Sequence, residues 1–141
     1  MTSNNIHERW VKFAQNDLSV AIREMNQTIN PRLRPFEVII YHCQQSAEKM
    51  LKAYIVSKGI LPPKHHKLED LRMICANFDN GFNSARLIQH CAFLNIFIAA
   101  RYPDFTMSVD ASNATRGINS AKRIHDFISK KLNLKDELYF K

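Results

Sequence analysis

The stretch YHCQQSAEKMLKAYIVSKG (residues 41–59) decides the fold, because it separates its apolar and polar residues onto two faces of one helix. Its apolar side chains, with one just before it, recur every three or four residues: Ile40, Cys43, Ala47, Met50, Leu51, Tyr54 and Ile55. A second set with a similar period is polar: His42, Gln45, Lys49 and Lys52. This pattern predicts a helix from about Phe36 to Lys58, and Gly59 suits the left-handed position after its end.

Four further segments show a helical period on either side of this stretch. They run from about Ile6 to Ile29, from Leu68 to Phe78, from near Ser84 to ARYPD (residues 100–104), and from Ser108 or Asp110 to Leu132. No strand-like alternation persists, so the sequence predicts an all-α fold, an antiparallel up-and-down bundle of four to five helices. We expect a single domain over residues 1–141, with a core at about 6–132 and a C-terminal tail at 133–141.

The composition indicates a globular protein with a basic surface. The chain has 141 residues, 45% of them hydrophobic, and 20 Lys and Arg against 13 Asp and Glu give a net charge of +7. The excess charge is spread along the chain with no polybasic tail. Such a surface favours an anionic partner such as RNA, a nucleotide or an acidic protein, although the same charge also serves solubility alone.

The cysteines and the apolar runs bear on compartment and metal binding. Cys43, Cys75 and Cys91 are odd in number, the opening MTSNNIHERW is polar, and no apolar run approaches the length of a membrane span. We therefore expect a cytoplasmic protein with reduced thiols and no membrane contact. His42 precedes Cys43 and His90 precedes Cys91, but adjacent helical residues point about 100° apart. Neither pair is suited to one ion, so we predict no metal and no cofactor.

Several motifs, taken together, resemble the HEPN domain family (higher eukaryote and prokaryote nucleotide-binding). They are Trp10-x3-Ala14-x2-Asp17-Leu18-x2-Ala21, YHCQQSAEKMLKAYI (41–55), PPKHHKLEDL (62–71), ARYPD (100–104) and DASNA (110–114). They occur in the family's order over roughly residues 6–132. The resemblance implies a bundle of four or five helices that commonly forms homodimers. It also implies a minimal nucleotidyltransferase as partner, in some cases within a toxin–antitoxin pair.

Toxic members of this family are ribonucleases that use Arg-x(4–6)-His near the start of the last major helix. This sequence departs from that motif, because Arg101 is followed by YPDFTMS and Arg116 by GINSAKR. Arg86 and His90 are only four positions apart and precede that helix. The chemistry needs an acid or base of near-neutral pKa beside a cation, so we predict no catalytic residues of this type.

Three groups of polar residues are candidate contacts, each with a simpler structural alternative. Asp17 lies inside an apolar stripe, where it either lines a groove or forms an internal hydrogen bond to Tyr41, His42 or a lysine. The KHHK sequence (residues 64–67) either holds phosphate near a helix N-terminus or is a solvated loop. Arg101 and Asp104 either contact a ligand or partner, or pair locally.

These observations support three alternative functions. The first is a non-catalytic nucleotide- or RNA-binding module that acts as a homodimer with a nucleotidyltransferase. Its candidate contacts are Asp17, His42, Gln45, Lys49, Lys52, Lys64, His66, Lys67, Arg101 and Asp104. The second is a ribonuclease toxin with a non-standard site, using His42, His90 or His125 with a nearby arginine. The third is a structural dimer with no ligand.

Overall fold

The computed structural model describes residues 6–27, 30–64, 66–100 and 102–134, and this part of the chain is helical with no strand. Its regular elements are α1 (Ile6–Met25), η1 (Pro31–Leu33), α2 (Phe36–Ser57), α3 (Leu68–Ala76), η2 (Asn80–Asn83), α4 (Ala85–Asn95) and α5 (Ala111–Lys131). The predicted all-α bundle is confirmed. None of the helices in these ranges combines the length and apolar character that a membrane crossing requires.

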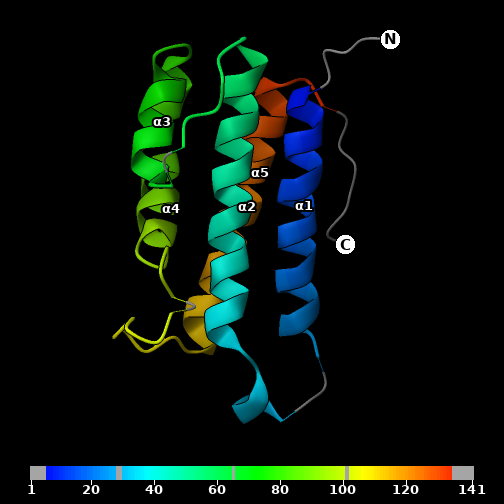
Figure 1. Ribbon diagram of the computed structural model, residues 1–141, viewed down its shortest axis with the longest axis vertical. Coiled ribbons are helices and arrows are strands. Elements are labelled where there is room, and N and C mark those ends of the chain that lie inside the picture. Colours follow the sequence, from blue (N-terminus) through cyan, green and yellow to red (C-terminus); the bar gives the residue numbers. More distant parts are fainter. Residues whose placement is uncertain (1–5, 28–29, 65, 101, 135–141) are drawn as a thin grey trace.

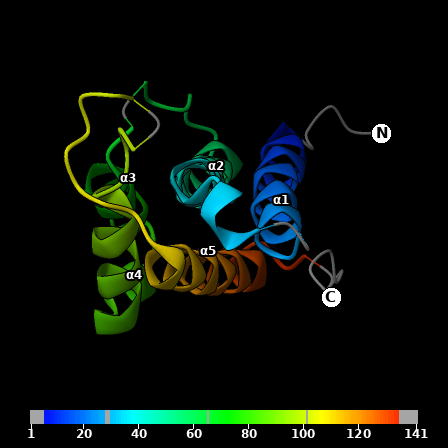
Figure 2. The same ribbon diagram turned by 90° about the horizontal axis from the view of Figure 1, so that it is seen from below.

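Helix α2 is the central element of the bundle. It contacts α1, α3, α4 and α5. Figures 1 and 2 show α1 on one side of α2, α3 and α4 on the other, and α5 across its back. The chain runs in opposite directions along α1 and α2 (Figure 1). Because four helices surround α2, side chains from several of its faces are fully buried, among them Ile39, Ile40, Met50, Leu51 and Ile55.

Local sequence signals explain where most helices begin and end. Ser84 Oγ accepts a hydrogen bond from Leu87 N and starts α4. Asp110 starts α5 through a capping box with Asn113, so Asp110 rather than Ser108 is the cap. Gly59 follows α2 with φ 81°, which confirms its predicted left-handed conformation.

Helix α4 ends at Asn95 rather than at the predicted ARYPD sequence. Beyond it the backbone forms tighter turns, in which Phe97 N bonds to Leu94 O at 3.0 Å and Ala100 N to Phe97 O at 3.0 Å. The Asn95 side chain is engaged elsewhere, because its Oδ1 accepts a bond from Leu68 N at the start of α3 at 2.8 Å. The apolar pattern of the sequence did not reveal that α4 ends at Asn95. Phe97 and Ala100 are buried in the turns that follow, so the apolar pattern continues past the end of the helix.

Two other predicted helix ends also differ from the structure. Helix α1 ends at Met25. Asn26 N bonds to both Ile22 O and Arg23 O, which marks the end of the α-helical ladder, and the predicted end at Ile29 lies outside the described residues. Helix α3 ends at Ala76, two residues before Phe78, within the usual scatter of helix ends.

Helices α2 and α5 approach closely at Gly117. A Cβ atom at this position would lie 3.0 Å from Ile40 Cγ1 and 3.7 Å from Cys43 Cβ. Both of these side chains are completely buried on α2, so neither has open space into which to move. The crossing therefore depends on a residue without a side chain at this position.

We expect Gly117→Val to lower the free energy of unfolding by about 2 kcal/mol, because its methyl groups overpack the α2–α5 contact. Urea titration followed by circular dichroism measures the change. Ser112→Val is the matched control, since Ser112 is exposed on the same helix. Equal stability of the two variants would show that the contact tolerates a side chain.

Candidate functional site

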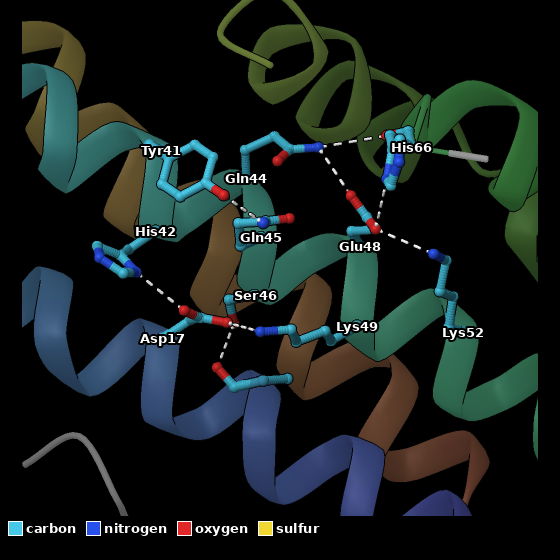
Figure 3. Close-up of polar contacts among 11 residues, drawn as sticks. Asp17, Tyr41, His42, Gln44, Gln45, Ser46, Glu48, Lys49, Lys52 and His66 are labelled. Atoms are coloured by element: carbon cyan, nitrogen blue, oxygen red, sulfur yellow. Dashed lines mark hydrogen bonds and ion pairs between the residues drawn. The ribbon is translucent and has the colours of Figure 1, made fainter. Parts of the chain in front are cut away.

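Asp17 of α1 forms a charged network with α2. Its Oδ1 lies 2.9 Å from His42 Nδ1 and its Oδ2 2.5 Å from Lys49 Nζ (Figure 3). His42 and Lys49 are seven positions apart, so two helical turns bring them to the same face of α2. The Asp17 side chain is 13% exposed. Of the two alternatives for Asp17, the structure shows the internal hydrogen bond, and the partners are His42 and a lysine, Lys49.

The network determines the ionisation of Asp17. Burial by itself would raise the pKa of this carboxyl, but the hydrogen bonds from His42 and Lys49 and the attraction of the same two groups outweigh burial. The pKa is therefore below its ordinary value. Beside this network, Ser46 Oγ donates to Ala14 O at 2.8 Å, which adds a neutral bond between the same helices.

A second polar network connects α2 to the segment before α3. Glu48 is only 6% exposed, and its Oε2 accepts from Lys52 Nζ at 3.0 Å and lies 3.1 Å from His66 Nδ1 (Figure 3). Gln44 Nε2 donates to His66 O at 3.3 Å and to Glu48 Oε1 at 3.5 Å. An ionised carboxylate only accepts hydrogen bonds, so Nδ1 of His66 carries a proton in this contact. Two buried side chains of α2 therefore hold His66 in place.

A cleft of about 620 Å³, named the α2–α3 cleft below, opens between α2, the segment that leads into α3 and the turns that follow α4. The described residues that line it are Tyr41, Gln44, Gln45, Glu48, Lys64, His66, Lys67, Asp70, Ile98, Ala99 and Tyr102. Helix α2 supplies one wall through side chains three or four positions apart, which lie on one helical face. The changed path of the chain after Asn95 brings Ile98 and Tyr102 to the opposite side.

The cleft combines aromatic, amide and charged groups. Tyr102 is 51% exposed, and Gln45 Nε2 donates to Tyr41 Oη at 2.6 Å. Lys64 and Lys67 are its cations and Asp70 opposes them, whereas the charge of Glu48 is already paired with Lys52, so the lining is of mixed charge. The cleft is therefore not a basic groove. Its chemistry suits a flat ring with hydrogen-bonding edges better than a bare polyanion.

The start of α3 is less suited to binding a phosphate than the sequence predicts. Leu68 N already donates to Asn95 Oδ1, and Glu69 and Asp70 occupy the first turn. These two carboxylates complement the positive end of the helix dipole. A phosphate in this cleft would therefore depend on the side chains of Lys64 and Lys67 rather than on helix amides.

The structure divides the predicted contact residues that it describes among four places. Four line the cleft: Gln45, Lys64, His66 and Lys67. Asp17, His42 and Lys49 form the α1–α2 network, and Lys52 is buried against Glu48 behind the cleft. Asp104 is exposed and does not line the cleft. Arg101 lies outside the described residues.

Sequence reasoning missed several lining residues, most importantly Gln44 and Glu48. Both are almost fully buried, with 1% and 6% of their surface exposed. A signal existed, because Gln44, Glu48 and Lys52 repeat at intervals of four on one helix. Polar residues at such spacing beside an apolar stripe indicate a polar network at the edge of the core.

The three candidate histidines have different surroundings. His42 is bound to Asp17. His125 is 5% exposed, with Nε2 3.2 Å from Gln15 Nε2, and burial lowers its pKa although Asp126 opposes the change. His90 is half-buried, and its Nδ1 lies 2.9 Å from Ser120 Oγ on α5.

The three cysteines lie in the core as free thiols. Burial, aided by Glu69, raises the pKa of Cys91 to about 12 against a weaker opposing effect of Arg72. Burial also raises the pKa of Cys43. A thiol that stays protonated is a poor nucleophile and a poor metal ligand, so these residues act as small apolar side chains.

Comparisons with known proteins give one family and two related structures. The HEPN domain profile matches residues 7–132. The crystal structure of TT1696 from Thermus thermophilus superposes with a TM-score of 0.76 at 20% identity, covering 90% of this chain and 98% of the other. ST0689, an archaeal HEPN homologue, gives 0.69 at 25% identity, covering 89% and 97%. No curated protein matches the chain by sequence.

We expect Asp17→Asn to destabilise the fold by about 2 kcal/mol at pH 7, because it leaves His42 and Lys49 without their carboxylate. The lowered pKa of Asp17 means that its contribution is present above the unfolded value of about 3.9 and is lost as pH falls through the folded value. Wild type and variant should therefore begin to converge below about pH 4 and should meet below the folded pKa of Asp17. Urea titrations from pH 7 to pH 3 test this, with exposed Asp104→Asn as control. A difference that does not change with pH would contradict the ion-pair explanation.

Proposed function

Because this chain belongs to the HEPN domain family, we propose that it is a non-catalytic module that binds a nucleotide or a short RNA segment in the cleft between α2 and α3. The observation that carries the proposal is the combination of groups in that cleft. Two tyrosines, two glutamine amides and two lysines line one cavity of about 620 Å³. That volume lies within the range of small-molecule sites.

Each group in the cleft has a role in such binding. An aromatic ring such as that of Tyr102 stacks on a base, and single-stranded RNA is commonly recognised in this way. Gln45 offers an amide to the base edge and is held in orientation by Tyr41. Lys64 and Lys67 lie at the rim, where they contact phosphate. The carboxylate of Asp70 opposes these cations and so limits binding of anions that carry no base.

The anchored His66 supports a binding role more than a catalytic one. Its Nδ1 is engaged by Glu48 and its backbone carbonyl by Gln44, so the segment is held before a ligand arrives. A preorganised wall lowers the entropic cost of binding. The sequence also lacks the family's ribonuclease motif, as described above.

We expect Tyr102→Ala to weaken ligand binding about tenfold, since stacking of one base on an aromatic ring contributes about 1–3 kcal/mol. Fluorescence anisotropy with a labelled decauridylate, and competition by ATP, measure the effect. Met107→Ala is the matched control, because Met107 has the same 51% exposure but does not line the cleft. Equal affinity of both variants, or RNA cleavage that His42→Ala, His90→Ala or His125→Ala abolishes, would overturn the proposal.

The proposal includes a partner: the chain forms a homodimer that works with a minimal nucleotidyltransferase. Its support is the family membership and the basic net charge of +7, which suits complexes with anionic ligands or acidic proteins. We expect sedimentation to give twice the 16.4 kDa chain mass, and we expect co-expression with a nucleotidyltransferase encoded beside this chain to yield a stable complex. A monomer that recovers no such enzyme would rule out this part.

A further inference from the structure

We propose that a second cleft, between the start of α4 and the end of α5, binds a phosphate oxyanion of a ribonucleotide ligand. This cleft has a volume of about 600 Å³ and shares no lining residue with the α2–α3 cleft. Arg86 and His90 line it from α4, one helical turn apart. Arg123, Asp126 and Lys130 line it from α5 at intervals of three and four, so they lie on one face.

The charge of this cleft differs from that of the first. Arg86, Arg123, Lys130 and Lys131 oppose a single lining carboxylate, Asp126. Lys131 is partly neutralised, because its Nζ lies 2.9 Å from Asp79 Oδ2. Within the described part of the chain, the other three cations and Asp126 form no ion pair. A cavity with unpaired cations attracts an anion.

His90 is positioned to contact that anion. Its Nδ1 lies 2.9 Å from Ser120 Oγ, so α5 fixes the orientation of the ring. No described residue hydrogen-bonds Nε2, the other ring nitrogen. Burial lowers the pKa of His90 first, and repulsion from Arg123, Arg116 and Arg86 lowers it further. A bound oxyanion would neutralise the cations that oppose protonation of His90. Asp126 is the one lining carboxylate, and its negative charge would repel that oxyanion.

The ends of the two helices are compatible with this assignment. Ser84 Oγ caps only Leu87 N, which leaves earlier amides of α4 at the positive end of its helix dipole. The end of α5 brings a negative dipole end to the same cleft, and Lys130 and Lys131 stand in its last turn as compensating charges. The side chains, rather than either dipole, therefore set the sign of the potential.

The geometry of arginine identifies the chemical class of the ligand. Two guanidinium groups from facing helices offer planar forks that match the oxygens of phosphate. Phe127 and Leu87 supply an apolar part of the lining, which suits a ribose or base attached to that phosphate. Two sources share this chemistry: a phosphodiester of RNA and the phosphate chain of a free nucleotide.

The test compares wild type with one double variant that carries both Arg86→Gln and Arg123→Gln. A labelled decauridylate, ATP and polyglutamate are the separate probes. We expect the variant to lose at least about tenfold in affinity for decauridylate or for ATP. A loss for decauridylate alone identifies the RNA backbone, and the slope of log affinity against log salt should then fall by about 1.4 for two lost contacts. A loss for ATP alone identifies the phosphate chain of a free nucleotide, and a loss for both shows that the cleft accepts phosphate from either source.

The matched control is Arg9→Gln with Lys12→Gln, which removes the same charge from exposed positions on α1. We expect it to change affinity less than twofold, because screened charges outside the site contribute little. In wild type the NMR signals of the His90 ring should also shift on addition of the bound probe, and they should not shift in the double variant. Unfolding midpoints verify that both double variants are folded.

Three results would overturn the inference. Equal losses in the two double variants would show a general effect of net charge, and binding of polyglutamate as tight as that of the nucleotide probes would show a site for acidic proteins. Unchanged binding in the Arg86 and Arg123 variant would show that this cleft is not used. Since Tyr102→Ala reports only on the α2–α3 cleft, failure of that proposal is distinguishable from failure of this one.

Discussion

Helix α2 contacts α1, α3, α4 and α5, so the polar side chains on its buried faces must find a partner inside the protein. The two polar networks follow from this constraint. Lys49 meets Asp17 across the α1 interface, and Glu48 meets Lys52 on its own helix and His66 on the following segment. Removing one partner would leave a desolvated group. The contacts of Asp17 therefore restrict how α1 packs on α2, and the contact of Glu48 with His66 restricts the segment before α3.

The buried pair of Glu48 and Lys52 and the half-buried contacts of Asp17 contribute differently to the structure. A buried ion pair adds little net stability, because desolvation offsets most of the attraction. The pair of Glu48 and Lys52 lies within one helix and so does not determine how helices pack. Its effect comes through the third member, His66, which it ties to the wall of the cleft. Asp17 joins two helices instead, and its network therefore contributes to the packing of α1 on α2.

The sequence was sufficient to predict the helices, because a helix that buries one face has apolar residues with a period of 3.6. That period can be recognised without knowing which helices pack against it. The sequence located α2 to within one residue at its end, and three of the candidate contacts that it named, Lys64, His66 and Lys67, line the α2–α3 cleft. It did not predict the end of α4 at Asn95, because that depends on a bond to Leu68 made only after folding. The place of Glu48 was missed for a related reason: Glu48 lines the same cleft as Lys64 only once the intervening chain has turned back.

The same reasoning explains why the α4–α5 cleft was not visible in the sequence. In the sequence, Arg86 and His90 form a motif with the wrong spacing, and His90 is a candidate for a non-standard ribonuclease site. The structure brings Arg123, 33 positions beyond His90, to the same cavity. A motif defined by spacing finds an arginine and a histidine only where they are close in the sequence. A helical bundle also brings together residues from two helices that are far apart in the sequence. Under the two proposals, the α2–α3 cleft takes the base of a nucleotide ligand and the α4–α5 cleft takes a phosphate, so the two clefts would select for different parts of that ligand. A ligand that carries both parts would gain affinity from both clefts only if it spans them, so chain length rather than base identity should govern any cooperation between them.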